Sequence, residues 1–249
     1  MSSSTTPTLQ PFPEDWERAL AIVAHPDDIE YGIAMAVARW TGQGKQVAYV
    51  LATSGEAGID GVPPDEAGPL REVEQRAAGE IVGVDTVEFL GFTDGIVPYD
   101  LELRSALAAA IRRHRPEVIV TINHELTFGP ADSGEAVLNM ADHRHVGLAA
   151  LDAARDAGNR WIFTDLLDEG LEPWDGVRFV GISATSTPTH AVDVTGHLDA
   201  GVASLDAHRA YLDGLADPLD VRAMLTGFAR AGGEGLGVDL AISFQVIRV

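Results

Sequence analysis

A histidine and two aspartates stand together in the segment VAHPDDIEYG, residues 23–32, directly after an apolar run. Adjacent carboxylates repel each other, and a dication bound beside them makes their proximity favourable. His25 and Asp28 are three residues apart in an expected tight turn, so both can reach one ion. Asp27 lies between them and must point elsewhere, where a general base beside a metal-activated water would fit. The segment therefore predicts two metal ligands and a base.

A third metal ligand must come from another part of the chain, because catalytic zinc typically has three protein ligands and an open position for water. The chain has no cysteine, so the other seven histidines are the candidates. His143 follows Asp142 in NMADHRHVG at an expected helix start, where an acidic neighbour can orient an imidazole. The histidines that also stay open are His124, His145 and His190. The histidines expected to be surface or structural residues are His114, His197 and His208.

The composition limits the partners that the chain can have. Of its 249 residues, 38 are acidic and 17 are basic, which gives a net charge of −21. This charge argues against nucleic acid and anionic membranes as partners, because both require basic patches. The lack of cysteine excludes disulfides, and the apolar runs are too short to cross a bilayer. We expect a cytoplasmic protein without membrane insertion; whether it forms a homo-oligomer stays open.

Short apolar runs alternate with amphipathic segments after the first residues of the chain. Residues 1–17 lack the features of a signal peptide and are expected to be a disordered lead-in to a single catalytic domain, residues 18–249. The alternation predicts an α/β fold whose sheet is mainly parallel, with helices on both faces. Strands are expected at residues 18–24, 45–53, 86–92, 117–123, 177–185, 189–194 and 240–249. Helices are expected at residues 32–44, 69–83, 101–116, 142–158, 197–212 and 218–231.

The position of the first motif agrees with this fold. Open α/β sheets bind ligands at the carboxyl ends of their strands, and the histidine and aspartates directly follow the first expected strand. The glycine-rich G-x-G-x-x-G pattern of dinucleotide-binding proteins is missing there. The sequence thus favours a metal site over a dinucleotide site at this end of the sheet.

Two motifs resemble those of a known enzyme family. AHPDDIEYG resembles the signature of the PIG-L/LmbE-like deacetylases, the zinc-dependent N-acetylglucosaminyl deacetylase family, and ADHRHVGLAALDAA resembles its second metal motif. The segments REVEQRAAGEIVGV and GFTDG resemble further family blocks in the same order. The resemblance extends from about Ala19 to the late helices and covers most of the chain.

The resemblance implies a Rossmann-like fold and a hydrolase acting on linear amides. Such an enzyme removes an N-acetyl or similar N-acyl group from an amino-sugar conjugate, a small-molecule substrate. By position, the metal ligands would be His25, Asp28 and His143, with Zn²⁺ as the cofactor and Fe²⁺ left open. Asp27 would be the general base. Arg71 and Asp94 would face the substrate.

One position departs from the family pattern. Many members carry a histidine three residues before the second-motif ligand, where it assists the metal at the oxyanion or acts as the acid. This sequence has Met140 there, and methionine can do neither. His124, in TINHELTFG, is the first candidate for the vacant catalytic role. His190, in PTHAVDV, is the second and is also expected to line the substrate pocket.

Other functions fit parts of the pattern. Two histidines and one carboxylate also form the facial triad of ferrous oxygenases, although those enzymes usually have all-β folds. A metal-binding module without catalysis is a further alternative, but it would not place a base beside an open coordination position. Within the hydrolases, the substrate could instead be an amide of a thiol conjugate or a natural product.

Overall fold

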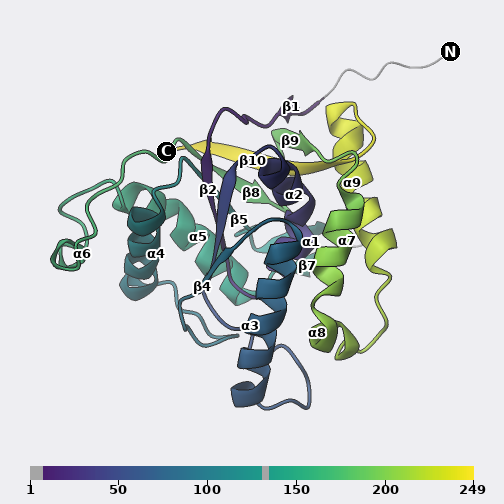
Figure 1. Cartoon of the computed structure of the whole chain (residues 1–249), viewed down its shortest axis with the longest axis horizontal. Coiled ribbons are helices and arrows are strands. Elements are labelled where there is room, and N and C mark those ends of the chain that lie inside the picture. Colours follow the sequence, from purple (N-terminus) through teal and green to yellow (C-terminus); the bar gives the residue numbers. More distant parts are fainter. Residues whose placement is uncertain (1–7, 131–134) are drawn as a thin grey trace.

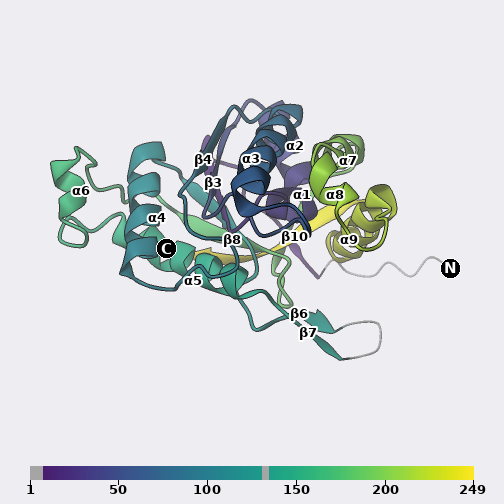
Figure 2. The ribbon, with the colours of Figure 1, turned by 90° about the horizontal axis from the view of Figure 1, so that it is seen from below.

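One eight-stranded sheet runs through the molecule, with helices on both of its faces (Figures 1 and 2). The structure is a computed structural model that describes residues 8–130 and 135–249. The strand order is β1-β9-β10-β8-β5-β2-β3-β4, and among these strands only β10 runs antiparallel to its neighbours. The expected α/β fold with a mainly parallel sheet is confirmed. The strands of this sheet are β1 (Gln10–Pro11), β2 (Arg18–Val23), β3 (Gln46–Leu51), β4 (Thr86–Phe89), β5 (Val118–Thr121), β8 (Phe179–Ser183), β9 (His190–Asp193) and β10 (Ala241–Arg248).

The helices form two layers around the sheet. α4 and α5 cover one face, and α2, α3, α7 and α9 cover the other, as Figure 2 shows. The helices are α1 (Asp28–Gly32), α2 (Ala34–Gly42), α3 (Pro64–Ile81), α4 (Leu101–His114), α5 (Ala141–Asp156), α6 (Asp165–Asp168), α7 (Leu198–Asp206), α8 (Arg209–Asp213) and α9 (Val221–Leu236).

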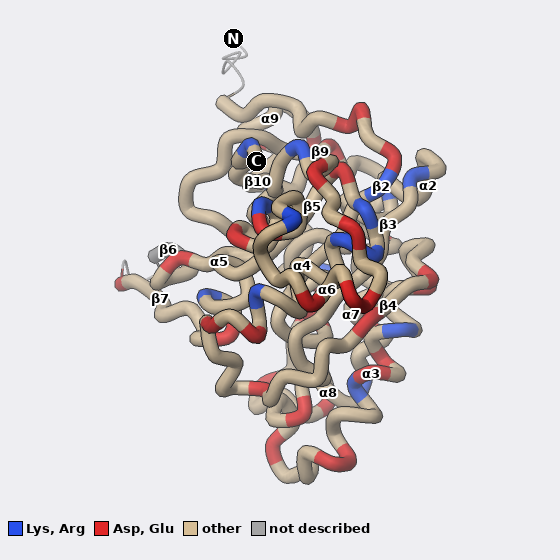
Figure 3. The backbone as a smooth tube through the Cα atoms, turned by 90° about the vertical axis from the view of Figure 1, so that its left-hand side faces the viewer, with Lys and Arg blue, Asp and Glu red and all other residues tan. Residues whose placement is uncertain are grey.

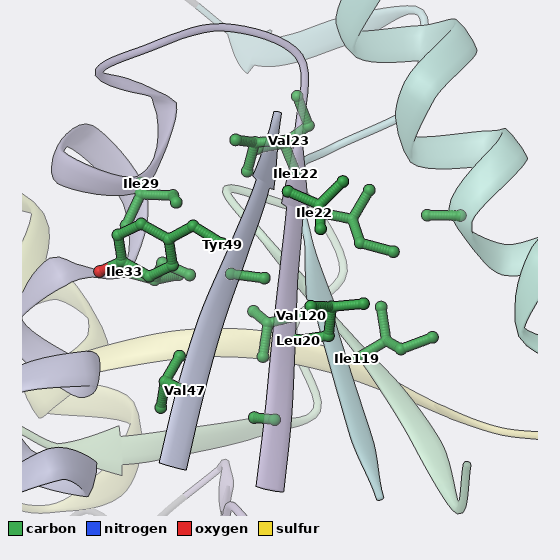
Figure 4. Close-up of a cluster of buried hydrophobic side chains, with 14 of the residues drawn as sticks. Leu20, Ile22, Val23, Ile29, Ile33, Val47, Tyr49, Ile119, Val120 and Ile122 are labelled. Carbon is green, nitrogen blue, oxygen red and sulfur yellow. The ribbon is translucent and has the colours of Figure 1, made fainter. Parts of the chain in front are cut away.

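The central strands carry apolar side chains on both faces, because helices cover both. Figure 4 shows Ile22 and Ile119 on one side of the strands and Val47 and Tyr49 on the other. Ile22, Ile119 and Tyr49 are fully buried. Near-continuous apolar runs are typical of such parallel strands, which is why the sequence locates them well.

The order of the strands reverses at β2. The chain adds β3 and β4 on one side of β2, then crosses over to add β5 and β8 on the other. A reversal of this kind opens a crevice at the carboxyl ends of the two strands that flank it. His25 follows β2 and Asn123 follows β5, so both lie beside this crevice.

The helix expected over residues 32–44 is present as α2, and a separate short helix, α1, precedes it. α1 begins at Asp28, inside the expected turn, and α2 begins after Ile33, whose φ of −138° is not helical. Ile29 and Ile33 are both buried in the core. Packing of these side chains outweighs the continuity of the helix, which sequence propensity alone would favour.

α3 begins five residues earlier than its expected start near Pro69. Pro64 lies in the first turn, where the missing N–H of proline has no helical partner to lose. Pro69 lies inside the helix and removes one internal hydrogen bond. The helix continues through it and buries Arg71 and Gln75 on its inner face, and this packing compensates for the lost bond.

Two further segments differ from expectation. The helix expected at residues 197–212 is broken into α7 and α8, with the fully buried His208 at the break. The long loop at residues 123–141 contains a two-stranded hairpin, β6 (Thr127–Pro130) with β7 (Ala136–Leu138). Segments this short carry too little periodicity for either feature to be predicted.

The expected lead-in at residues 1–17 is wrong for its described part. Gln10 and Pro11 pair with β9, and the side chains of Phe12 and Trp16 are buried in the core. The prolines and polar residues around these two aromatic residues give the segment the composition of a disordered region. Packing of the two aromatic side chains in the core orders it. Residues 1–7 of the expected lead-in lie outside the described residues.

Charged residues are spread along the backbone of most elements (Figure 3). Acidic residues occur on the helices of both layers and in the loops between them. None of the helices in the described ranges has both the length and the apolar character needed to cross a membrane.

Candidate active site

The candidate site lies at the crevice between β2 and β5. The loop after β2 supplies His25 and Asp27, and the first residue of α1 is Asp28. The first turn of α5 supplies His143. Segments more than a hundred residues apart in the sequence thus meet at one edge of the sheet.

His25, Asp28 and His143 come together as expected. One ligand atom of each lies within 4.8 Å of the ligand atoms of the other two. Nε2 of His143 is buried and has no hydrogen-bond partner among the described residues, yet it lies 2.9 Å from Oδ1 of Asp28. Two such atoms directed at one point are placed as ligands of a shared cation.

Neighbouring groups orient the His143 ring. Oδ1 of Asn139 lies 3.2 Å from Nδ1 of His143, four residues along the chain. The amide nitrogen of Asn139 donates to the carbonyl oxygens of Asn123 at 2.7 Å and Glu125 at 3.0 Å, so its oxygen must face the ring. Nδ1 of His143 therefore donates to Asn139, and Nε2 keeps its lone pair for a metal.

The backbone orients Asp28 in the same way. Its Oδ2 accepts hydrogen bonds from the backbone N–H groups of Ala24 at 3.0 Å and His25 at 2.7 Å. Oδ1 stays free of these bonds and faces His143. The tight turn that the sequence predicts is thus present, and it divides the two carboxylate oxygens between the backbone and the candidate metal position.

Two carboxylates surround the other ring. Nε2 of His25 lies 3.1 Å from Oδ1 of Asp94 and 3.2 Å from Oδ2 of Asp142. Asp142 also accepts from the backbone N–H groups of Gly95 and Val97, which fix its position. His25, Asp94 and Asp142 form a second group close enough to share an ion, but these bonds suit carboxylates that orient a ligand histidine.

The charges at the site leave room for a cation. Burial raises the pKa of Asp28, but His143 and His25 outweigh this and hold that pKa well below its usual value. Burial lowers the pKa of His25, but hydrogen bonds with Asp142 and Asp28 outweigh it and raise that pKa to about 12. Several carboxylates therefore attract positive charge to one point. Two imidazoles and a carboxylate are a donor set that zinc or ferrous iron accepts, so the residues fit a divalent metal.

Asp27 is held in a strained backbone conformation beside these ligands. Its φ of 85° lies in the left-handed region that glycine favours. Its backbone N–H donates to Oε1 of Gln75 at 2.9 Å, and its Oδ2 accepts from Nη2 of Arg71 at 2.8 Å. Burial raises the pKa of Asp27 to about 7, with the Arg71 charge opposing the rise. A buried carboxyl with such a pKa can both take up and return a proton near neutrality.

Arg71 lies at the site but is engaged by the protein itself. Besides Asp27, its guanidinium donates to the carbonyl oxygens of Gly55 at 2.8 Å and Pro26 at 2.7 Å. A side chain at Gly55 or Gly58 would place its Cβ 2.2 Å from Nη1 of Arg71. Glycines at these positions therefore make the space in which the guanidinium reaches the base.

A buried polar network lies behind the base. Nε2 of Gln75 donates to Oε1 of Glu30 at 3.1 Å, and Oγ of Ser204 donates to the same oxygen at 3.3 Å. Oε2 of Glu30 lies 3.3 Å from Nε2 of His208, and both of these side chains are 0% exposed. The network connects the backbone of Asp27 to α1, α3 and the break between α7 and α8.

Two cavities meet at these residues. The larger, about 590 Å³, extends towards α9 and the β6–β7 hairpin, and the smaller, about 510 Å³, extends towards the loops after β3 and β4. Both volumes are in the range of small-molecule sites, roughly 300–1,000 Å³. The residues that line both cavities are Asp27, Asp28, Met140, His143 and Tyr211.

The remaining expected site residues differ in their positions. Arg71 and Asp94 line the smaller cavity, as a substrate-facing role requires. His124 and His190 are not among the described residues that line either cavity. His124 packs against Gly147 of α5, and Nδ1 of His190 lies 2.8 Å from the hydroxyl of Thr189. Neither is therefore placed where the sequence suggested a catalytic or substrate-binding role.

Several residues of the site were missed or misplaced in the sequence analysis. Asp142 was expected to orient its neighbour His143, but it contacts His25 instead. Asn139 lies just before α5, outside the helix, so helical spacing did not point from it to His143. Gln75 and Tyr211 gave no signal, because each reaches the site from a helix whose position depends on the tertiary fold.

Two histidines and a carboxylate that could hold a metal ion, beside a buried carboxyl at the switch point of an α/β sheet, are an arrangement suited to metal-dependent hydrolysis. Comparison with known proteins agrees. The model of the PIG-L family, described as GlcNAc-PI de-N-acetylase, matches residues 20–154, more than half of the chain. The chain belongs to this family, and the resemblance of its two motifs is confirmed.

Relatives and solved structures show where the similarity lies. The chain is 29% identical over 203 residues to the diacetylchitobiose deacetylase of Thermococcus kodakarensis, which covers 81% of this chain and 72% of that protein. It is 32% identical over 170 residues to the 1D-myo-inositol 2-acetamido-2-deoxy-alpha-D-glucopyranoside deacetylase of Geodermatophilus obscurus, covering 57% of this chain and 55% of that one. The N,N'-diacetylchitobiose deacetylase from Pyrococcus horikoshii, solved with its inhibitor MPG, superposes with a TM-score of 0.82 at 24% identity, covering 94% of this chain and 85% of that chain.

Proposed function

We propose that the protein is a metal-dependent N-deacetylase that removes the acetyl group from an amino-sugar conjugate. The observation that carries this proposal is the triad His25, Asp28 and His143 with Asp27 beside it, between two cavities of small-molecule size. The activities named for the relatives in Thermococcus and Geodermatophilus support it. We also propose that the described chain acts as one catalytic domain, which includes residues 10–17 as well as 18–249.

His25, Asp28 and His143 would hold the ion. When bound, a divalent metal would polarise the amide carbonyl and lower the pKa of a water molecule. Asp27 accepts the proton of the attacking water and then delivers it to the leaving amine nitrogen. One oxygen of Asp27 is bonded to Arg71, so the other is the one that carries the proton. The acyl carbon gains the water oxygen as its bond to nitrogen breaks, which yields acetate and a free amine.

Arg71 and Gln75 keep the base in place during these steps. Arg71 bonds the Asp27 side chain and Gln75 bonds its backbone N–H. The positive charge of Arg71 also opposes the effect of burial on the Asp27 pKa. Asp94 lies at the smaller cavity and provides an acceptor for sugar hydroxyl groups.

A hydrogen-bond donor is still needed at the position that Met140 leaves vacant. Met140 lines both cavities and its side chain can donate no hydrogen bond. Tyr211 lines both cavities as well, and burial raises the pKa of its hydroxyl, which therefore stays protonated. We assign the oxyanion donor to Tyr211 in place of the expected His124.

Zinc is the proposed metal, and ferrous iron is the alternative that the same donor set allows. The family membership and the α/β sheet favour a hydrolase over a ferrous oxygenase or a binding module. A cytoplasmic location is proposed from the composition, together with a small-molecule substrate and no nucleic-acid partner.

The experiment that tests the function is a measurement of amine release from a panel of N-acetylated substrates. The panel contains N-acetylglucosamine, diacetylchitobiose, an N-acetylglucosaminyl inositol and an N-acetylated thiol conjugate. Protein stripped of metal and reloaded with zinc or ferrous iron is compared with the stripped protein. Release from an amino sugar by reloaded protein alone is expected. Metal loading without release from any amino sugar would contradict the proposal.

A further inference from the structure

The two cavities at the candidate site differ in the chemistry of their walls. Apart from the shared residues, the smaller cavity contains charged and backbone groups such as Arg71, Asp94 and Gly95. The larger one contains no Lys, Arg or Glu among its described lining residues, and Asp27 and Asp28 at the centre are its only carboxylates. Besides uncharged polar residues (Asn123, Ser183, Thr185 and Ser243), the larger cavity has apolar side chains that the smaller one lacks, among them Ile122, Phe128, Phe228 and Ile242.

The mouth of the larger cavity carries exposed apolar side chains from three segments. Phe228 on α9 is 58% exposed, Met140 before α5 is 57% exposed and Phe128 on β6 is 40% exposed. All three line the cavity. Large apolar side chains gathered at the opening of an apolar cavity mark a place where apolar ligand surface is bound.

The geometry of an amide assigns one substituent to each cavity. An amide group is planar and, in its trans form, its acyl and nitrogen substituents point in opposite directions. A scissile carbonyl placed over Asp28 and His143 lies where the two cavities meet. One cavity therefore takes the acyl group and the other takes the sugar on nitrogen.

The residues that line each cavity indicate which one binds the acyl group and which one binds the sugar. Sugar hydroxyl groups need hydrogen-bond partners, and Asp94 and the nearby backbone supply them in the smaller cavity. The larger cavity has no charged group among its described lining residues away from the centre, and its large side chains are mostly apolar, which suits an acyl chain; its volume of about 590 Å³ also far exceeds that of one methyl group. Resting on the proposed deacylation at this site, we propose that the larger cavity binds the N-acyl group and that the substrates include amino sugars with N-acyl chains longer than acetyl.

The reaction needs no further reactant. Water adds its oxygen to the acyl carbon, the carbon–nitrogen bond breaks, and the nitrogen leaves with the proton that Asp27 returns. The products are a fatty acid and an amino sugar. The length of the chain changes only the apolar contacts in the larger cavity.

A chain-length series tests the proposal. N-acetyl-, N-butanoyl- and N-octanoyl-glucosamine are compared by amine release from zinc-loaded protein. Burying a methylene group favours binding by about fourfold per group, so kcat/KM is expected to rise from acetyl to butanoyl and again to octanoyl. A fall in kcat/KM beyond acetyl would overturn the proposal. So would a series of octyl glycosides of N-acetylglucosamine that gains rate while the N-acyl series does not, since the larger cavity would then bind the aglycone.

A matched pair of variants locates the effect. Ala231→Trp places a large ring in the wall of the larger cavity, whereas Arg230→Trp places it on the neighbouring exposed position of α9, which does not line the cavity. The ratio of octanoyl to acetyl hydrolysis is expected to fall at least about tenfold in Ala231→Trp and to be unchanged in Arg230→Trp. An equal ratio in both variants would exclude this cavity as the acyl site.

Binding without turnover separates this proposal from the deacylase function itself. Calorimetry of the Asp27→Asn variant with each N-acylglucosamine is expected to show tighter binding of the octanoyl compound, with a more negative heat-capacity change. Hydrolysis of the acetyl compound without any preference for the longer chain would overturn the chain-length proposal alone. If neither compound is hydrolysed by metal-loaded protein, the deacylase function fails, and equal binding of both compounds would then overturn the acyl assignment as well.

Discussion

The adjacent aspartates of the first motif divide two tasks between them. Asp28 faces His143 with one oxygen and the backbone with the other. Asp27 turns away through a left-handed backbone conformation and meets Arg71 instead. Strain of this kind at a non-glycine residue is costly and is found mainly at functional sites. The opposite directions of the two side chains explain how like charges can be neighbours here.

Substitution of each aspartate is expected to give a different defect. Asp27→Asn should lower kcat by about 10²- to 10⁴-fold and leave bound metal unchanged, because it removes the base but no ligand. Asp28→Asn should lower metal content under the same conditions, because it weakens a ligand. Metal analysis beside amine release checks both variants. Loss of metal in Asp27→Asn, or full activity without Asp27, would contradict the assigned roles.

Tyr211 is expected to matter for the rate more than its neighbour Tyr31. The two rings lie 6.5 Å apart, but Tyr211 lines both cavities and Tyr31 only the larger one. If Tyr211 donates to the oxyanion, Tyr211→Phe should lower kcat by about 10²-fold and change KM little. Tyr31→Phe is the matched control. Equal effects of the two substitutions on kcat would remove Tyr211 from this role.

At the level of elements, the strands were far more predictable than the helices. Each buried strand is an apolar run bounded by polar or glycine residues. The strand positions predicted from such runs therefore agree with those in the structure. The break at Ile33, the early start of α3 at Pro64 and the division at His208 are set by tertiary contacts instead. The helix propensity of a segment does not depend on the distant residues that it contacts in the folded chain, so it cannot predict these helix boundaries.

The segment before β2 is tied to α2 by a half-buried acid. Oε1 and Oε2 of Glu14 accept hydrogen bonds from Arg39, Oε1 accepts from Trp40, and Lys45 donates to the backbone oxygen of Glu14. Burial raises the pKa of Glu14, but the bonds from Arg39, Trp40 and Gln43 outweigh it and lower the pKa below 4.5. Ionised Glu14 therefore stabilises the fold.

The stability that Glu14 contributes is expected to depend on pH. It is present above the unfolded pKa near 4.5 and is lost as the pH falls through the lower pKa of the folded state. Glu14→Gln should therefore be less stable than the native chain at pH 7, by at most about 1 kcal/mol because solvent screens the pair. Chemical denaturation at pH 7 and at pH 3 checks this. A difference that grows towards pH 3 would have the wrong sign.

At the level of the whole molecule, the order of strands places the site. β2 and β5 are separated in the chain by two strands and four helices, yet they are neighbours in the sheet. The pattern of alternating elements predicts a parallel sheet but does not fix which strands are neighbours. The grouping of His25, Asp28 and His143 could be predicted, because these residues follow recognisable motifs. The cavities and the position of Tyr211 could not, since they arise from the packing of α8, α9 and the hairpin.

The ordered N-terminal segment belongs to the core of the molecule. The Phe12 ring is 4% exposed and packs 4.9 Å from Phe244, 5.4 Å from Phe179 and 5.6 Å from Trp40, measured between ring centroids. Phe12→Ala is expected to lower the free energy of unfolding by about 3–5 kcal/mol. Chemical denaturation measures this change, and exposed Phe228→Ala is the control. Equal free energies of unfolding of the two variants would show that the N-terminal segment does not contribute to the core.

The central claim is that one divalent ion at His25, Asp28 and His143 makes the chain a deacetylase. Titration of metal-free protein with zinc, with acetate release from diacetylchitobiose followed at each addition, tests it most directly. Activity is expected to rise in proportion to added zinc and to reach its maximum at one ion per chain. His143→Ala should show no such rise. Acetate release without metal, or no release at one equivalent of bound zinc or ferrous iron, would contradict the account.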